Sequence, residues 1–318
     1  MRLKIRTVLA AASALLLAAG CGAAEGSSGG DGTTLRIGII SPRNALYDPL
    51  GYLHAKGRLL ELLKPAGVTG IKVLGFGKGP DLNQALLAGS LDVGILGDTP
   101  GIVAKAQDVD TRLIGQERVG MDAAIVVRKG GPTTVKGLAG KRVATTTGGY
   151  THRYLRGLLN RYGVEAEIQN VAGPDQFAAL RSGSVDAVAT SLESALLIME
   201  KGGFPVIDTS EKRPELQGNS ITVATASYVK ARPGFPKVWR AALDTAAKAA
   251  VADWDGYLAY YAEARGYSVE ITRAASRKDQ YTDAQLSPAL LKGLEGTKQF
   301  LLSEKYIKED VDLDAWVS

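Results

Sequence analysis

The feature that most constrains the fold of this chain is a segment that occurs twice in the sequence. The stretch GPDLNQALLAGSLDVGILG (79–97) recurs without a gap as GPDQFAALRSGSVDAVATS (173–191), with eight identities in nineteen positions. In each copy Gly-Pro-Asp predicts the start of a helix, with Asp81 or Asp175 placed to cap it. Gly-Ser then ends the helix, and an aspartate leads into a short apolar strand. Two halves of the chain therefore share one design, and chance use of common capping and turn residues is the weaker explanation.

A second apolar strand precedes each copy, at residues 71–76 and 166–171. Each half therefore reads strand, loop, helix, strand, which is the order of a parallel βαβ unit. Such units need helices on both faces of the sheet and bind ligands at the carboxyl ends of the strands. The sequence predicts an α/β protein of two similar Rossmann-like lobes.

The same pattern extends around both copies. Strands at 35–40 and 142–146 each run into a loop and then into a helix with one apolar side. Apolar stretches at 123–127 and 221–225 are interpreted as the two crossover strands between the lobes. The expected limits are 34–126 plus 223–318 for lobe 1 and 127–222 for lobe 2. Helices at about 235–264 and 283–302 are expected to follow, and the tail DVDLDAWV (310–317) is expected to pack on lobe 1.

The N-terminus has the pattern of a secretion signal. Arg2, Lys4 and Arg6 precede an apolar run that is too short to span a bilayer and ends at Cys21. The sequence Leu-Ala-Ala-Gly-Cys resembles the lipobox of bacterial lipoproteins, which implies a signal peptide at 1–20 and a lipid on Cys21. Residues 21–33 are rich in Gly and Ser, as in a flexible tether. Ordinary signal cleavage with a stray cysteine is the alternative.

The composition excludes several kinds of site. Cys21 is the only cysteine, and His54 and His152 are the only histidines, so a disulfide, a thiolate nucleophile and a Cys/His metal site are excluded in the mature chain. Removing residues 1–20 lowers Lys+Arg from 38 to 35 against 33 Asp+Glu, a net charge of about +2. This balance does not indicate a nucleic-acid surface. The chain has neither a GxSxG nor an HExxH motif, and no metal, cofactor or enzymatic activity is expected.

Three segments resemble one family of transport proteins. FGKGPDLNQALLAGSLDVGILGDTP (76–100), VKGLAGKRVATTTGG (135–149) and DVDLDAW (310–316) are similar to the aliphatic-sulfonate, taurine and nitrate-binding proteins of ABC importers. The resemblance implies the type II periplasmic-binding-protein fold. It also implies an exported monomer, periplasmic or anchored to the outer face of the cell membrane. Such a protein closes its lobes around a small anionic solute and delivers it to a permease driven by an ATPase. The chain departs from the family at TTTGGYTHR (145–153) and at 191–193, where sulfonate binders often have a serine-rich turn and Trp-Asp-Pro.

Three predicted loops of the first lobe carry candidate ligand-binding residues. Arg43, next to Asn44, is placed either to clamp an anion bidentately or to lie solvated on the surface. Gly79 closes a glycine-rich turn in which the third glycine is displaced from its place in a dinucleotide fingerprint, so an ordinary turn and helix cap is favoured. Thr99 offers a hydroxyl group, and Asp98 is expected either to cap the next helix or to receive an amine.

The second lobe carries the largest group of candidates. Thr146, Thr147, Gly148, Gly149, Tyr150 and Thr151 combine hydroxyl donors, glycines that permit close approach, and the start of a helix. Glu193 completes the candidate set, and His152 is expected to be a surface or capping residue. Tyr47 and Tyr150 leave open a second ligand, a thiamine-precursor pyrimidine. An enzyme on the same fold is a further alternative, although the pyrimidine synthases that resemble this family depend on a cysteine-rich motif absent here.

Overall fold

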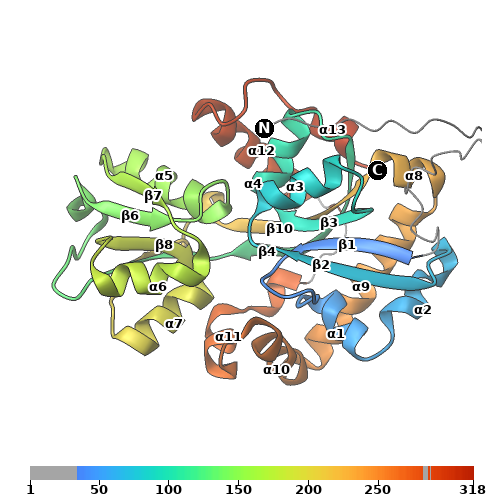
Figure 1. Cartoon of the computed structure of the whole chain (residues 1–318), viewed down its shortest axis with the longest axis horizontal. Helices are drawn as coiled ribbons and strands as arrows, with labels where there is room; N and C mark the ends of the chain where they lie inside the picture. Colours follow the sequence, from blue (N-terminus) through green and yellow to red (C-terminus); the bar gives the residue numbers. More distant parts are fainter. Residues whose placement is uncertain (1–33, 282–285, 287) are drawn as a thin grey trace, which may run out of the picture. The chain divides into compact units, whose positions relative to one another are not determined.

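The computed structural model describes residues 34–281, 286 and 288–318, and these residues form two five-stranded sheets (Figure 1). The signal peptide, Cys21 and the tether predicted over residues 1–33 lie outside the described residues, as do residues 283–285 of the last predicted helix. Within the described part of the chain, no helix is both long enough and apolar enough to cross a membrane.

The two sheets have the same plan. In each, three parallel strands are followed by a strand that runs antiparallel to them and by an edge strand. The first sheet has the order β2 (Gly70–Phe76), β1 (Thr34–Ile40), β3 (Val93–Gly97), β10 (Gly218–Thr225), β4 (Thr111–Met121). The second has the order β7 (Glu167–Asn170), β6 (Arg142–Thr145), β8 (Ala187–Ser191), β5 (Ala123–Val127), β9 (Val206–Thr209). The prediction of two similar α/β lobes is confirmed.

The two copies of the repeated segment lie in different sheets. The first forms α3 (Gly79–Leu87) and then β3, and the second forms α6 (Gly173–Ser182) and then β8. The capping expected of Asp81 and Asp175 is not observed, since neither side chain accepts a backbone N–H of its helix. Each aspartate lies inside the first turn, after the proline, and the N-cap positions are Lys78 and Ala172. Their charges still lie at the favourable, positive end of the helix dipole.

A matching ion pair supports each sheet at the aspartate that follows the repeated helix. Asp92 accepts hydrogen bonds from the backbone N–H, Nε and Nη2 of Arg36 on β1. Asp186 accepts the same three from Arg142 on β6. These hydrogen bonds from Arg142 are the main cause of a lowered pKa of the Asp186 carboxyl. The two halves of the chain thus share a side-chain contact as well as a sequence pattern.

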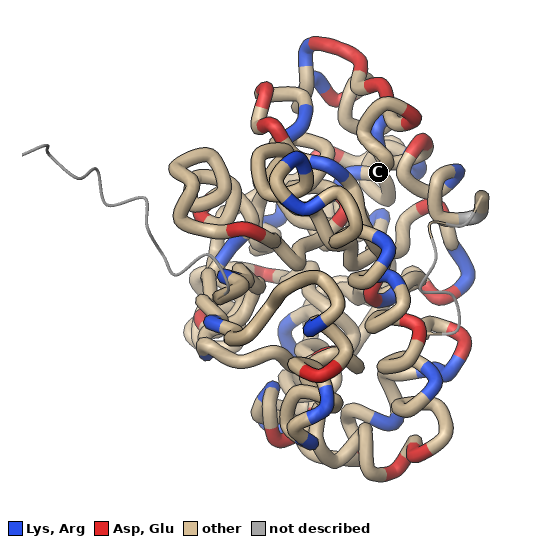
Figure 2. Tube along the Cα trace, turned by 90° about the vertical axis from the view of Figure 1, so that its right-hand side faces the viewer, with Lys and Arg blue, Asp and Glu red and all other residues tan. Residues whose placement is uncertain are grey.

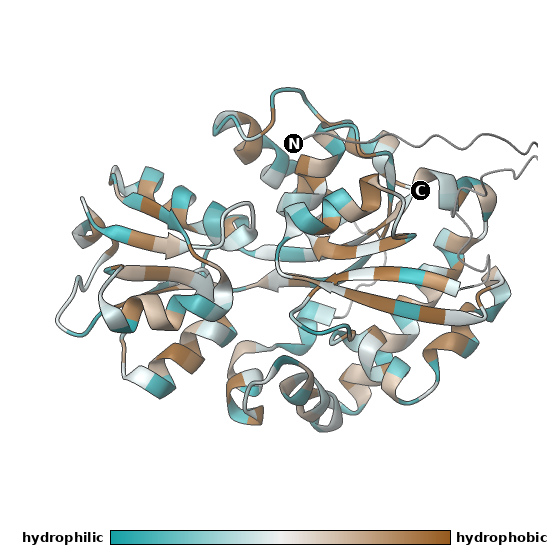
Figure 3. Cartoon of the chain, in the orientation of Figure 1, coloured by the Kyte–Doolittle hydropathy of each residue, from teal (hydrophilic) through white to brown (hydrophobic). Residues whose placement is uncertain are grey.

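Helices cover both faces of each sheet. The apolar side chains of α1 (Pro49–Ala55), α2 (Leu59–Leu63) and α9 (Phe235–Ala252) pack on one face of the first sheet. The other face packs against α3, α4 (Asp98–Ala106), α12 (Pro288–Ser303) and α13 (Leu313–Trp316). In the second lobe, α5 (Tyr150–Tyr162) covers one face, and α6 and α7 (Leu192–Gly202) cover the other. Hydrophobic residues accordingly concentrate along the strands and the helix faces toward them (Figure 3), and charges of both signs are interspersed along the trace (Figure 2).

Shorter elements complete the described chain. They are η1 (Lys64–Ala66), η2 (Val135–Leu138), η3 (Pro214–Leu216), α8 (Ala226–Ala231), α10 (Trp254–Arg265), α11 (Val269–Ala275) and η4 (Lys278–Tyr281).

The prediction of a single helix over 235–264 is wrong in one respect, because the helix is divided at Asp253. The backbone of Asp253 leaves the helical region, and its side chain accepts the N–H of Gly256 to start α10. The tail packs on the first lobe as expected, with Trp316 fully buried and bonded through its indole N–H to Thr111.

The chain crosses between the lobes outside the two strands that were predicted to be the crossovers. β5 pairs only within the second sheet and β10 only within the first, so neither strand spans both sheets. The chain leaves the first sheet at Met121 and enters the second at Ala123. It leaves the second sheet at Thr209 and returns to the first at Gly218.

Candidate ligand-binding site

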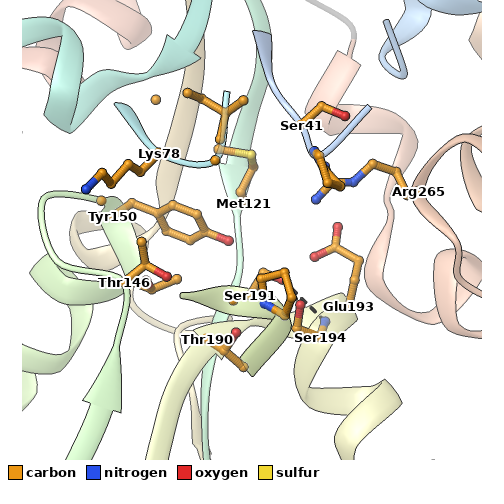
Figure 4. Close-up of a pocket in the computed structure, with 18 of the residues that line it drawn as sticks. Ser41, Lys78, Met121, Thr146, Tyr150, Thr190, Ser191, Glu193, Ser194 and Arg265 are labelled. Atoms are coloured by element: carbon orange, nitrogen blue, oxygen red, sulfur yellow. Dashed lines mark hydrogen bonds between the residues drawn. The ribbon is translucent and has the colours of Figure 1, made fainter. Parts of the chain in front are cut away.

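A cavity of about 620 Å³ lies between the two lobes. Its walls come from the carboxyl ends of the parallel strands in both sheets, where βαβ folds bind ligands. From the first lobe come the ends of β1, β2 and β3 with the residues after them, two residues of β4, one of β10, and the end of α10. From the second lobe come the loops after β6, β7 and β8, the first turn of α5, and α7 along most of its length. Figure 4 shows side chains of both lobes converging on this space.

The loop between β6 and α5 forms one wall. All six of its predicted candidates line the cavity: Thr146, Thr147, Gly148, Gly149, Tyr150 and Thr151. Gly148 has a φ of +80°, a conformation that favours glycine. Among the described residues, no acceptor is found for the backbone N–H groups of Gly149, Tyr150 and Thr151 at the start of α5. These free donors and the positive end of the helix dipole make this wall attractive to an anion.

The hydroxyl groups of this loop are not equally available. The Thr151 hydroxyl is buried and lies 3.1 Å from that of Thr145, while the Thr146 hydroxyl donates to the Val171 carbonyl. No protein partner of the Thr147 hydroxyl is found in the described part of the chain, which makes it the more available donor.

His152 lies in the first turn of α5, where the sequence predicted a surface or capping residue. The residue is 7% exposed, so the surface alternative is wrong. Nδ1 accepts the N–H of Gly148 at 3.4 Å, and Nε2 lies 3.1 Å from the hydroxyl group of Tyr306. Burial, followed by the nearby Arg156 charge, lowers the pKa of His152, so the neutral ring that can accept from Gly148 is favoured.

Glu193, at the start of α7, forms an ion pair across the two lobes. Ser191 caps the helix by accepting the N–H of Ser194, and Glu193 projects from the same turn into the cavity. A Glu193 carboxylate oxygen lies 2.8 Å from Nη1 of Arg118 on β4, with both side chains at least nine-tenths buried. The Ser194 hydroxyl lies 3.0 Å from that of Tyr267 in the first lobe.

A β-bulge explains how β4 presents Arg118. Arg118 pairs with Ser220 and Gln116 with Ile221, so Glu117 is an extra residue opposite β10. Glu117 is buried, and its Oε1 accepts the hydroxyl hydrogen of Thr222. Burial, with the nearby Asp48 charge, raises the pKa of Glu117 to about 8.

Asp48 forms part of the cavity wall at the start of α1. Its carboxyl is buried, and Oδ2 has no hydrogen-bond partner among the described residues. Burial raises the pKa of Asp48 to about 6, although the positive charges of Arg118 and Arg265 oppose the shift. Asp48 therefore takes up a proton more readily than an exposed aspartate does.

Arg265, the last residue of α10, also lines the cavity. Its guanidinium lies 4.3 Å from the ring centroid of Tyr47 and 6.0 Å from that of Tyr267. Its Nε is buried without a hydrogen-bond partner. The four hydrogen-bonded acceptors of Arg118 are Glu193, Tyr261, the Ala275 carbonyl and Gln280. Among the described residues, Arg265 has no comparable set of acceptors.

Four predicted site residues are not part of the cavity wall. Arg43 donates to the carbonyl of Glu263 in the last turn of α10, and Asn44 accepts the N–H of Gly75. Asp98 is fully buried in an ion pair with Arg153, and Thr99 donates its N–H and hydroxyl to the same carboxylate. Each of these side chains is committed to a protein partner, so we remove all four from the candidate site. Gly79 and Glu193 remain in the wall.

Several polar residues of the cavity were not predicted from the sequence. Ser41 and Asp48 follow the first strand, in the loop that also contains the predicted residues Arg43 and Asn44. Arg118 and Arg265 come from β4 and from the end of α10, at positions where neither strand ends nor helix starts pointed to a site. The repeat could not reveal them, because neither residue belongs to it. Within the described part of the chain, no group of three or more His, Cys, Asp or Glu side chains is placed to hold a metal ion.

The chain is similar in sequence to sulfonate- and taurine-binding proteins. A candidate aliphatic sulfonates-binding protein of Escherichia coli (strain K12) is 32% identical over 192 residues, which cover 58% of this chain and 56% of that protein. The taurine-binding periplasmic protein of the same organism is 30% identical over 140 residues, 43% of each chain. These matches span about half of the relatives' lengths or less.

Solved structures extend the likeness to the whole fold. The alkanesulfonate-binding protein SsuA from Xanthomonas axonopodis pv. citri, bound to MOPS, is 22% identical with a TM-score of 0.76, covering 90% of this chain and 98% of that one. The desulfurization enzyme DSZB is 20% identical with a TM-score of 0.71, covering 90% and 96%. At these identities the likeness shows the fold alone, and that fold is shared by binding proteins and an enzyme.

The family match rests on sequence. The family described as NMT1/THI5 like matches residues 69–255, more than half of the chain, and this range includes both copies of the repeat and most of the cavity wall. The resemblance to sulfonate- and taurine-binding proteins is confirmed, and the chain belongs to the NMT1/THI5-like family, with the two-lobed fold of periplasmic binding proteins.

Proposed function

We propose that the protein is an extracytoplasmic solute receptor of an ABC importer, which binds a small anionic solute between its lobes and delivers it to a permease driven by an ATPase. The observation that carries the proposal is the cavity of about 620 Å³, whose walls come from both lobes. It has the size of a small-molecule site, and it combines free backbone donors at the start of α5 with the unpaired guanidinium of Arg265. A sulfonate, taurine or nitrate is the class of solute that these donors suit.

The proposed role needs binding and release but no chemical step. Contacts at Arg118–Glu193 and Ser194–Tyr267 join the two lobes beside the cavity. The passages near Asp122 and between residues 209 and 218 are the segments about which the lobes would open. We take the receptor to act as a monomer.

A thermal-shift screen tests the proposal. The mature protein is mixed with ethanesulfonate, taurine, nitrate, propionate and a thiamine-precursor pyrimidine. A solute at one hundred times its Kd stabilises the folded protein by about 2.7 kcal/mol, so an anion that binds is expected to raise Tm by roughly 4–5 °C. The bound solute should be recovered unchanged. Conversion of the solute would support an enzyme instead. An unchanged Tm with all four of ethanesulfonate, taurine, nitrate and propionate would contradict an anion receptor.

A pyrimidine receptor is the second candidate, because aromatic rings form much of the wall. The rings that line the cavity belong to Tyr47, Phe76, Tyr150, Phe177, Tyr261 and Tyr267. Aromatic rings stack on a flat heterocycle, whereas an anion needs donors and positive charge. A Tm shift with the pyrimidine alone would favour this candidate.

We also propose that a lipid on Cys21 anchors the protein to the outer face of the cell membrane. The lipobox-like sequence and the Gly- and Ser-rich residues that follow support this, although they lie outside the described residues. Cys21→Ser is expected to move the protein from the membrane fraction to the soluble fraction without changing solute affinity, because the tether separates Cys21 from the lobes. A Cys21→Ser protein that still carries lipid and stays with the membrane would refute the anchor.

A further inference from the structure

One guanidinium group of the cavity wall, that of Arg265, makes no ion pair with the described residues. Four cationic residues line the wall: Lys78, Arg118, Lys201 and Arg265. Lys78 and Lys201 are exposed, and Lys78 lies 3.7 Å from Asp81. Arg118 is satisfied by its four acceptors. Arg265 alone of these four combines burial of a donor atom with the lack of any ion pair among the described residues.

Two carboxylates, those of Glu193 and Asp48, lie on the cavity wall with Arg265 but form no ion pair with it. Figure 4 shows Glu193 and Arg265 extending toward each other from opposite lobes. Glu193, however, already lies 2.8 Å from Nη1 of Arg118, and no ion pair joins it to Arg265. Asp48 also makes no ion pair with Arg265, and its Oδ2 remains without a hydrogen-bond partner. The charges of Asp48 and Glu193 act on Arg265, but neither carboxylate accepts a hydrogen bond from it, so its N–H donors remain available at the edge of the cavity.

Two tyrosine rings hold the guanidinium in place. Tyr47 lies against it at 4.3 Å and Tyr267 at 6.0 Å, a cation–π arrangement that orients the planar group without using its N–H donors. The Tyr47 hydroxyl is fixed by the Ile40 carbonyl, and that of Tyr267 meets Ser194 of the other lobe. A buried donor without an acceptor destabilises the empty protein, and an acceptor on a ligand removes that cost.

Arg43 supports the turn that carries Arg265. Its Nη1 donates to the carbonyl of Glu263 at 3.0 Å, two residues before Arg265, and lies 3.5 Å from the carbonyl of Ala264. Gly266, with a φ of +75°, then ends α10. The arginine that the sequence suggested as an anion clamp thus holds the helix end that presents another arginine.

We propose that Arg265 binds the oxyanion head group of the solute, a sulfonate or a carboxylate, and that Arg43 is a positioning residue for it. This inference rests on the proposed function and assigns the anion to one end of the cavity. The planar guanidinium presents parallel N–H donors that match two oxygens of such a group, and the tyrosine rings hold that plane before the solute arrives.

Calorimetry with ethanesulfonate and with propionate tests the assignment. Arg265→Gln is expected to weaken binding of the head group it prefers by about 10- to 100-fold, because a charged hydrogen bond is lost. Arg265→Lys should recover part of the affinity, since it restores charge without the planar fork. Arg273→Gln is the matched control, because Arg273 is an exposed arginine of the same lobe that pairs with Asp255 outside the cavity, and its Kd should equal that of the wild type.

The outcomes separate this inference from the proposed function. If the wild type binds either anion and Arg265→Gln binds it equally well, the assignment to Arg265 is wrong while the anion receptor stands. If the wild type binds neither ethanesulfonate nor propionate, the inference is refuted, whereas the anion receptor is refuted only if taurine and nitrate also fail to bind. Should Arg265→Gln fail to fold, Arg265→Lys alone decides, because wild-type affinity in that variant would refute recognition by a planar fork.

A double-mutant cycle tests the role of Arg43. Arg43→Ala is expected to weaken anion binding by about 3- to 10-fold in the wild type and to have no further effect in Arg265→Gln. The same loss of affinity in both backgrounds would show that Arg43 acts independently of Arg265. Melting curves of each variant, recorded beside the calorimetry, show how much of the change is a loss of stability.

Discussion

Asp98→Asn is expected to lower the free energy of unfolding by about 3–5 kcal/mol, since it leaves a buried guanidinium without its counter-charge. Asp98 on α4 is fully buried, and Arg153 on α5 is 3% exposed, with 3.2 Å between Oδ2 and Nη2. The same oxygen also accepts from Asn219 and Thr297, so the carboxylate joins elements of both lobes. The Asn side chain has nearly the same shape, and the loss therefore reports the charge.

Chemical unfolding monitored by circular dichroism gives the measurement. The control is Asp81→Asn, which removes a carboxylate that is 54% exposed at the start of α3 and makes only a loose ion pair with Lys78. Such surface pairs contribute about 0–1 kcal/mol. Similar destabilisation in the two variants would contradict a special role for the Asp98–Arg153 pair.

Gly148→Val is expected to weaken solute binding by about 10- to 100-fold, because a side chain at this position enters the space between the lobes. A Cβ on Gly148 would lie 3.8 Å from Cγ of Pro80, in the opposite lobe, and the methyl groups of valine reach further toward it. The side chain would hold the lobes apart and cover the donors at the start of α5. The positive φ adds about 1–2 kcal/mol of backbone strain to the folded state.

Gly163→Val separates the two effects in Gly148→Val. Gly163 ends the same helix with a φ of +62°, and a Cβ there meets nothing within 4 Å. It should reproduce the loss of stability, measured by Tm, and leave the Kd unchanged. Equal affinity of Gly148→Val and Gly163→Val would show that the loop after β6 does not face the solute. Gly149 has a φ of −111° and therefore does not need a glycine for its conformation.

The sequence predicted those parts of the site that are encoded locally. The loop 146–151 could be found because paired glycines, hydroxyl groups and a helix start occur together within a few residues. The roles of Arg43 and Asp98 were left open between two alternatives for the opposite reason. Whether an arginine or aspartate after a strand faces the solute or the protein depends on partners that are distant in sequence, here Glu263 and Arg153.

The sequence by itself determined the two-lobed α/β architecture. A βαβ unit is specified by short-range signals, namely glycines that end helices and apolar strands, and the repeated segment carries these signals twice. The tertiary structure alone decided which charges meet the cavity. Arg118 reaches it through a bulge in β4, and Arg265 through the end of a helix 147 residues further along the chain. Both positions depend on long-range packing, because an isolated arginine in a sequence has no pattern to show whether its charge will be paired, as in Arg118, or left free, as in Arg265.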